Sequence, residues 1–203
     1  LTINNSEYIE IKNTTISGSG IDAVSFAGCT NIIFSYNNVL NTNNNAVIFY
    51  LCNSVRSERN KIKNAGVRPG MGLSQTGQYS GMILKGNNNQ CKSNIIDSVG
   101  YVGLLFDGSY VRIINNMISN FCMTLDDGGG IYTWSDGKSI CDDRQIESNI
   151  VLSGIGAGEG TNEIKKIIAE GIYMDERTMN VKIINNTVTN CSGGVLIHNA
   201  SNI

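Results

Sequence analysis

The feature that most constrains this chain is a short repeat built around asparagine. In each copy, Asn or Thr stands two residues before an aliphatic residue, and a small residue further along opens a second apolar run. Successive copies are 24, 22, 34, 22, 33 and 37 residues apart, so a unit of about 22 residues recurs with three long insertions. An internal repeat of this length is typical of a solenoid. The seven copies are Thr14-x-Ile16, Asn38-x-Leu40, Asn60-x-Ile62, Asn94-x-Ile96, Asn116-x-Ile118, Asn149-x-Val151 and Asn186-x-Val188.

The pattern within each copy predicts β-strands. Apolar residues recur at every second position, for example five residues before the Asn at Ile9, Ile33 and Val55. The second run starts after the small residue, as in GMILK (81–85) and GLLFD (103–107). About 22 residues are too few for a strand and a packed helix but enough for a closed turn of two or three strands. Stacking such turns makes parallel sheets, and an Asn in each turn can bridge to the Asn of the next coil.

This repeat resembles the right-handed parallel β-helix of the pectate-lyase-like superfamily, over essentially all 203 residues. The resemblance implies an all-β, right-handed, single-stranded parallel β-helix of about seven coils with loop insertions. A narrower similarity lies in LDDGGGIYTW (125–134), GIYMDE (171–176) and GGVLIHNAS (193–201). These segments are similar to parts of secreted bacterial β-helix glycoside hydrolases and polysaccharide lyases, including fucosidase-like and xylosidase-like members. That similarity favours Asp127 and Asp175 as working carboxylates.

Composition limits the other possibilities. We expect residues 1–203 to form one β-helix domain, because one Pro and 23 Gly without a polar linker give no hinge. Both ends of the chain read as parts of coils, so we expect a fragment of a longer protein with flanking domains. A net charge of −2 gives no basic field, so we expect no nucleic-acid partner. No apolar run is long enough to span a membrane. The family resemblance implies a bacterial protein that is secreted or at the cell surface.

The cysteines and acids predict no cofactor. Six Cys are scattered without a CxxC pair and the only His is far from them, so we expect buried thiols and no metal ion. The segment 126–130, which reads DDGGG, has two interpretations. It is a tight turn, or its acids approach Ca²⁺, although an EF-hand loop spaces its acids alternately. A further expectation is a short helix within residues 158–170, in which Glu163 and Lys166 pair.

Two columns of side chains are expected on the outside of the Gly-led strands. The second and fourth residues after the Gly point outward if the first and third are buried. Long insertions at 65–80, 135–143 and 156–170 lie beside the same coils and are the expected walls of a cleft. The fourth positions, in coil order, are Ala27, Tyr50, Lys85, Asp107, Trp134, Asp175 and His198. The second positions are Ser25, Ile48, Ile83, Leu105, Tyr132, Tyr173 and Leu196.

Carboxylates, a base and aromatic rings in one groove suit sugar chemistry. The leading hypothesis is a glycoside hydrolase acting on a poly- or oligosaccharide, with Asp107 and Asp175 as the carboxylate pair. Their backbones, two coils apart, would be about 9–10 Å from each other. Lys85 and His198 would assist the catalysis. The residues expected to bind substrate are Trp134, Tyr132, Tyr173, Arg177, Arg68 and Glu176.

Two alternatives stay open. The first is a polysaccharide lyase acting on a uronate polymer, in which Lys85 or His198 abstracts a proton and Arg68 or Arg177 neutralises the sugar carboxylate. The second is a carbohydrate-binding, structural or adhesive β-helix without catalysis. In that case an outward acid such as Asp107 is simply solvated, and Trp134 packs under its own loop.

Overall fold

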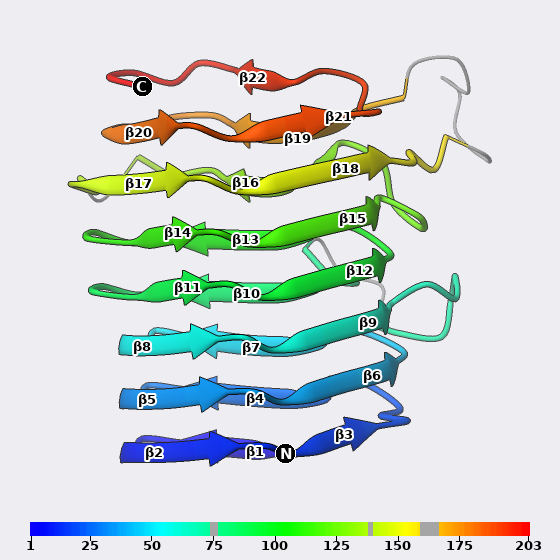
Figure 1. Ribbon diagram of the computed structural model, residues 1–203, viewed down its shortest axis with the longest axis vertical. Coiled ribbons are helices and arrows are strands. Elements are labelled where there is room, and N and C mark those ends of the chain that lie inside the picture. The colour runs from blue at the N-terminus through cyan, green and yellow to red at the C-terminus, as the bar shows by residue number, and fades with distance from the viewer. Residues whose placement is uncertain (74–76, 138–139, 159–166) are drawn as a thin grey trace.

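The chain folds as a right-handed parallel β-helix, as the repeat predicts. The computed structural model describes residues 1–73, 77–137, 140–158 and 167–203. Each coil contributes one strand to each of three parallel sheets, and no helix occurs among these described residues. Seven full coils and the first strand of an eighth are stacked along one axis (Figure 1). The helix expected within residues 158–170 falls largely on 159–166, outside the described residues.

The three sheets are named here in chain order. Sheet A consists of β1 (Thr2–Asn4), β4 (Val24–Ala27), β7 (Val47–Tyr50), β10 (Met82–Lys85), β13 (Leu104–Asp107), β16 (Gly128–Thr133), β19 (Ala169–Met174) and β22 (Val195–Ile197). Sheet B consists of β2 (Glu7–Lys12), β5 (Thr30–Ser35), β8 (Asn53–Glu58), β11 (Gln90–Lys92), β14 (Arg112–Ile114), β17 (Arg144–Glu147) and β20 (Val181–Ile184). Sheet C consists of β3 (Thr15–Ser17), β6 (Asn38–Thr42), β9 (Lys61–Ala65), β12 (Ile95–Val99), β15 (Met117–Phe121), β18 (Ile150–Gly154) and β21 (Thr187–Thr189).

The repeated Asn forms a buried ladder between sheets B and C. The Oδ1 of Asn116 accepts hydrogen bonds from the backbone N–H and the Nδ2 of Asn94, both at 3.0 Å. The Nδ2 of Asn116 donates to the carbonyl of Cys91 and to the Oδ1 of Asn149. Every polar atom of this buried amide therefore has a partner, which avoids the cost of about 1–3 kcal/mol for each unsatisfied group. The ladder contains Asn37, Asn60, Asn94, Asn116, Asn149 and Asn186.

The sequence pattern assigns the second copy of the repeat to Asn38, which is one residue too late. Asn37, not Asn38, occupies the ladder, since its backbone N–H donates to the Oδ1 of Asn60 at 2.9 Å. Asn38 instead pairs with Lys61 on the outer side of sheet C. The same shift applies to β5, where Ile32 is buried in the core and Ile33 faces outward. Tandem Asn and tandem Ile residues fit the alternation in either register, and burial decides between the two.

Asparagine has a second use at the corners of each coil. Columns of residues with positive φ run along the stack, and Asn adopts this left-handed conformation more readily than most residues. One column, at the corner between sheets B and C, is Asn13, Tyr36, Arg59, Ser93, Asn115, Ser148 and Asn185. Another, at the end of sheet C, is Gly18, Asn41, Asn64, Ser98, Asn120, Ser153 and Asn190.

The core lies inside the stack and repeats from coil to coil. Phe26 and Phe49 lie in register on β4 and β7, and their rings stack with centroids 5.0 Å apart. Phe34 of β5 meets both rings edge-on. Five of the six cysteines are buried, Cys191 is half-buried, and all six are free thiols. The apolar surface buried between successive coils is the main stabilising contribution to the fold.

The long insertions leave the stack at two different corners. The segments after β9 and β18 both leave where sheet C passes into sheet A (Figure 1). The segment after β16 leaves at the opposite end of sheet A, where the chain turns into sheet B. The three insertions therefore do not line one cleft, and each corner has its own loops.

Candidate active site on the outer face of sheet A

Strand pairing puts the two expected columns on adjacent strands of sheet A. Lys85 pairs directly with Asp107, and Tyr132 pairs with Leu105 on one side and Tyr173 on the other. Asp175 and His198 come directly after strands β19 and β22. Their backbone N–H groups continue the pairing between coils, since they donate to the carbonyls of Thr133 and Met174, both at 2.9 Å. The coil register therefore brings the predicted outward residues onto one face.

At the C-terminal coils, this face carries a cluster centred on Asp175. The hydroxyl of Tyr132 donates to Oδ2 of Asp175 at 2.7 Å, and Nδ1 of His198 lies 2.9 Å from Oδ1. Tyr173 also acts to lower the pKa of this carboxylate. The coils before and after that of Asp175 thus each place a side chain on its carboxylate, from positions 43 and 23 residues away from Asp175 in the sequence.

Burial and hydrogen bonding oppose each other at Asp175. Burial acts to raise the pKa of its carboxyl, but the hydrogen bonds from Tyr132, His198 and the backbone N–H of Glu176 outweigh burial and lower the pKa. For Tyr132, burial and the bond to Asp175 act in the same direction and raise the pKa well above the ordinary value of tyrosine. At neutral pH the cluster therefore consists of an ionised carboxylate and neutral, protonated tyrosines.

The ionised carboxylate fixes the orientation of His198. Because Asp175 accepts at Nδ1, that nitrogen carries the proton, and Nε2 of the neutral ring holds the lone pair. Nε2 lies 3.2 Å from the side-chain amide of Asn199, which donates to it. The His198 side chain is 48% exposed, whereas that of Asp175 is 18% exposed. The imidazole ring is therefore half-exposed to solvent, while the carboxylate behind it is largely covered.

The two tyrosine rings are packed rather than presented as flat platforms. Tyr132 and Tyr173 are 8% and 6% exposed, and they meet edge-to-face with centroids 5.2 Å apart. They form a small apolar cluster with Val102 and Leu105 on the outer face of sheet A. Stacking a sugar on these rings, as expected from the sequence, does not fit this burial. Their hydroxyl groups are the parts that reach the site.

Asp127 enters the same cluster from the opposite end of the strands. It precedes β16 by one residue, and its carbonyl accepts a hydrogen bond from the Tyr101 hydroxyl at 2.8 Å. Burial and then the negative charges of Asp127 and Asp175 raise the pKa of Tyr173. The two carboxylates that the family resemblance favours thus act on one tyrosine hydroxyl between them. Neither the DDGGG segment nor any other described part of the chain gathers three His, Cys, Asp or Glu groups that could hold a metal ion.

Next to the cluster lies a groove. It is lined by the fourth-position residues of the preceding coils, from Tyr50 to Trp134. Its volume is about 510 Å³. Lys85, Asp107 and the 43%-exposed Trp134 line it, together with Cys141 from the insertion after β16. Of the three insertions that were expected to wall one cleft, the one after β16 contributes Ser135, Asp136, Ile140 and Cys141 to this groove. Asp107 bonds the backbone N–H of Gly108 at 2.7 Å.

Behind Asp107 lies an arginine that the sequence did not single out. Arg144 is almost fully buried, and its guanidinium lies 5.8 Å from the ring centre of Phe106 and donates to the carbonyl of Met179. Burial lowers the pKa of Arg144, and the charges of Cys141 and Asp107 oppose that effect. Asp107 and Asp175 are two strand spacings apart, about 10 Å along the stack. The groove and the cluster are thus neighbouring parts of one face.

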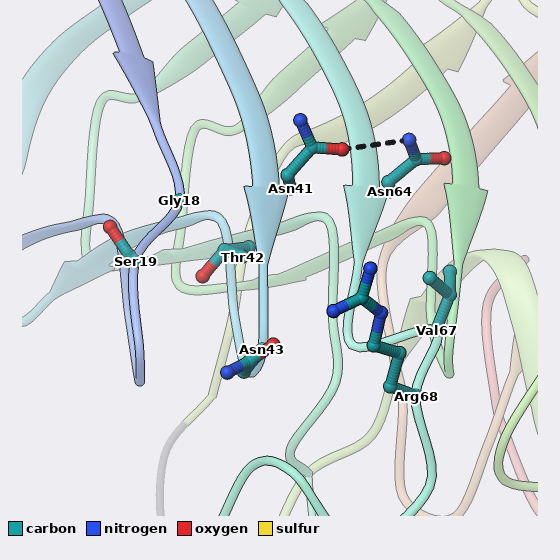
Figure 2. Close-up of a pocket in the computed structure, with 8 residues that line it drawn as sticks. All are labelled: Gly18, Ser19, Asn41, Thr42, Asn43, Asn64, Val67 and Arg68. Atoms are coloured by element: carbon teal, nitrogen blue, oxygen red, sulfur yellow. Dashed lines mark hydrogen bonds between the residues drawn. The ribbon is translucent and has the colours of Figure 1, made fainter.

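The remaining expected residues are divided between this face and another part of the molecule. Arg177 follows Asp175 by two positions and donates to the carbonyl of Asp136 at 3.1 Å, so it borders the cluster. Glu176 contributes its backbone N–H to Asp175. Arg68 lines a separate pocket at the corner between sheets C and A (Figure 2). It is four coils from Asp175, about 19 Å along the stack, and does not belong to the cluster.

Comparisons with known proteins agree on the fold. The A-module of the mannuronan C-5 epimerase AlgE4 from Azotobacter vinelandii superposes with a TM-score of 0.61 at 13% identity, over 97% of this chain and 58% of that one. The periplasmic alginate epimerase AlgG gives a TM-score of 0.45 at 12% identity, over 98% of this chain and 47% of that one. The chain thus spans about half the length of these structures. No family model matches the sequence, and no curated protein is significantly similar to it. Among the described residues, no helix has the length and apolar character needed to cross a membrane.

Proposed function

We propose that this chain is a carbohydrate-active β-helix enzyme that abstracts a proton from a uronate residue of a polysaccharide. The observation that carries the proposal is the bonding of Asp175. An ionised carboxylate holds Nδ1–H of His198, so Nε2 carries the lone pair and would act as the general base once substrate replaces the amide of Asn199. This is the orienting role that a buried Asp has toward a catalytic His in other enzymes.

In this mechanism His198 removes the proton from the carbon next to the sugar carboxylate. Asp175 would stabilise the imidazolium that results, and Arg177, two residues further along the chain, would offset the charge that develops on the sugar carboxylate. The hydroxyls of Tyr132 and Tyr173 stay protonated at neutral pH, and one of them would be the proton donor, a weak acid because burial raises its pKa. If the proton goes to the glycosidic oxygen, the C–O bond breaks and a C=C bond forms. If it goes back to the same carbon from the opposite face, the sugar is epimerised.

Two further observations favour this chemistry over hydrolysis by Asp175. Both oxygens of Asp175 are already hydrogen-bonded to Tyr132 and His198, so neither is left to hold the attacking water of a glycosidase. The AlgE4 module, which has the same fold, is a mannuronan C-5 epimerase. Inversion at a carbon next to a carboxylate starts with the loss of that proton, so the fold is suited to such a substrate.

A glycoside hydrolase is the second candidate, because of the groove around Asp107. Asp107 lies there with a half-exposed Trp134, and its backbone is about 10 Å from that of Asp175. Inverting glycosidases separate their carboxyl groups by roughly 6.5–9.5 Å. In this alternative Asp175 would act as the base and Asp107 as the acid. Either activity suits the expected location outside the cell and a polysaccharide partner, both of which stay predictions.

The test uses mannuronan and polygalacturonate in deuterated water. The proposal predicts either a product that absorbs in the ultraviolet, from elimination, or deuterium at the carbon next to the carboxylate, from epimerisation. We expect His198→Ala to abolish both signals and Asp107→Asn to retain at least about a tenth of the activity. New reducing ends without unsaturation or deuterium, lost in Asp107→Asn, would identify the hydrolase instead. Binding without any product, unchanged in His198→Ala, would leave the non-catalytic alternative.

A further inference from the structure

A second pocket lies away from the cluster around Asp175, at the corner between sheets C and A on the first three coils. Its volume is about 420 Å³. Figure 2 shows that its side chains come from the ends of neighbouring coils and face a common space. No acidic residue is among those that line it, which are Gly18, Ser19, Asn41, Thr42, Asn43, Asn64, Val67 and Arg68.

One wall of this pocket is held rigidly from behind. Thr42 is 3% exposed, and its hydroxyl donates to the carbonyl of Ile21 at 2.6 Å. Directly after it, Asn44 donates to Asp22 at 2.7 Å and to Gln78 at 2.6 Å, inside the protein. The Asp22 carboxylate also accepts a hydrogen bond from the backbone N–H of Asn45, so it is already bonded to groups inside the protein. The chain at 42–45 is therefore preorganised before any ligand arrives.

The opposite wall offers hydrogen-bond donors. Asn64 donates to the Oδ1 of Asn41 at 2.9 Å, which orients both amides along the corner. The Arg68 guanidinium is exposed and points into the space between Asn43 and Asn64 (Figure 2). Within the described part of the chain, no hydrogen bond or ion pair engages this guanidinium. The pocket thus combines one available cation with neutral amides and a hydroxyl group.

We propose that this pocket binds an acidic sugar unit at a site separate from the catalytic face. The Arg68 guanidinium presents two parallel N–H groups, which match the two oxygens of a sugar carboxylate. The amides of Asn41, Asn43 and Asn64 have donors and acceptors for the ring hydroxyls beside that carboxylate. A dianionic phosphate would need more than this one cation. The proposal does not depend on the chemistry at Asp175, which lies four coils away.

The test separates the two sites by their signals. Trp134 is the only tryptophan and lines the groove, so ligand in the groove changes its fluorescence, whereas ligand at the pocket does not. We would titrate the chain with trigalacturonate and with the corresponding neutral galactose trisaccharide. Calorimetry detects binding at both places, and fluorescence detects binding at the groove. The expected result is a calorimetric component for trigalacturonate that is absent from the fluorescence.

Three variants decide the outcome. Arg68→Ala should weaken the fluorescence-silent component at least about tenfold, the usual effect of losing a charge-assisted hydrogen bond. Ser19→Asp adds a negative charge to the pocket without removing a described hydrogen bond, and it should weaken the same component. Lys92→Ala removes one exposed positive charge on sheet B and should leave the affinity of the fluorescence-silent component unchanged. Equal losses in Lys92→Ala and Arg68→Ala, equal binding of the neutral trisaccharide, or no silent component would each overturn the proposal. Activity retained in His198→Ala, together with an intact silent component, would overturn only the proposed function.

Discussion

The carboxylate of Asp175 decides what the side chains around it can do. Its lowered pKa keeps it ionised, and the ionised form sets the proton on His198 and keeps Tyr132 protonated. A neutral side chain in its place would leave the imidazole free to turn. The orientation of the His198 ring therefore depends on Asp175, a neighbour that contacts no substrate in the proposed mechanism.

This arrangement predicts a pH-dependent stability. A group whose folded pKa is lowered stabilises the protein above its unfolded pKa of about 3.9, and that contribution is lost as the pH falls through the folded value. Asp175→Asn should therefore unfold at lower urea concentration at pH 7, with a loss of about 1–2 kcal/mol. Below about pH 4 the difference between the two proteins should shrink. A difference that stays constant from pH 7 to pH 3 would contradict the assignment.

Tyr8 shows the conformational cost that the corner columns impose. It has a φ of 57° and is 79% exposed, so its ring gains little from packing while its backbone is in the left-handed region. Asn31, on the next coil, holds the same position and conformation. Tyr8→Asn should stabilise the chain by about 0.5–1 kcal/mol, because Asn tolerates this conformation better. Thermal unfolding measures the effect, and Tyr8→Val is the matched control that should destabilise.

Among the elements, the buried Asn ladder distinguishes the register that places Asn37 inside the stack from the one that places Asn38 there. Asn37 is 1% exposed, and its amide bonds the carbonyl of Ile11, the backbone N–H of Thr14 and the side chain of Asn60. Asn37→Ala leaves several buried groups without partners and should cost about 2–4 kcal/mol. Asn38→Ala, one residue along, removes only a 3.4 Å contact with Thr15 and should cost less than about 0.5 kcal/mol. Equal losses in chemical denaturation would mean that the ladder register is wrong.

The same comparison shows what the sequence predicts well. The period-2 pattern and the recurring Asn predict the strands and the coil-to-coil pairing, because each buried position has to repeat at the same point of every coil. Two tandem pairs, Ile32–Ile33 and Asn37–Asn38, satisfy the pattern in two registers, so the pattern alone does not choose between them. Only the packing of whole coils makes Ile32 the buried member.

The site follows the same rule. Asp107, Asp175 and His198 belong to the predicted column because strand register alone places them. Arg68 and Tyr101 lie on connections whose path depends on tertiary contacts, so the sequence misplaced the first and missed the second. The burial of Tyr132 and Tyr173 also has no local signal, since it results from the loops that cover sheet A.

At the scale of the whole molecule, each further coil of the sequence lies one strand spacing further along a single axis. From Tyr50 to His198, successive coils each add one outward residue, so the groove and the cluster together extend over about five strand spacings, or about 24 Å. Lys85 lies too far from Asp175 to act on the same sugar carboxylate. Under the proposed function, Lys85 would bind the carboxylate of another unit of the same polymer, and Arg177 would serve the reacting unit.

A dependence on substrate length follows from this geometry. An oligouronate that reaches from His198 to Trp134 and Lys85 gains contacts that a shorter one lacks, so KM should fall with length until the chain spans about 24 Å. Trp134→Ala should raise KM for the long substrate about tenfold, since stacking on an exposed ring contributes about 1–1.5 kcal/mol, and should leave the shortest substrate unaffected. Tyr8→Ala, an exposed aromatic on the first coil, is the control that should alter neither value. If Trp134→Ala raises KM equally for short and long substrates, the groove does not act as an extension of the site at Asp175. The polymer then runs across the coils rather than along the stack.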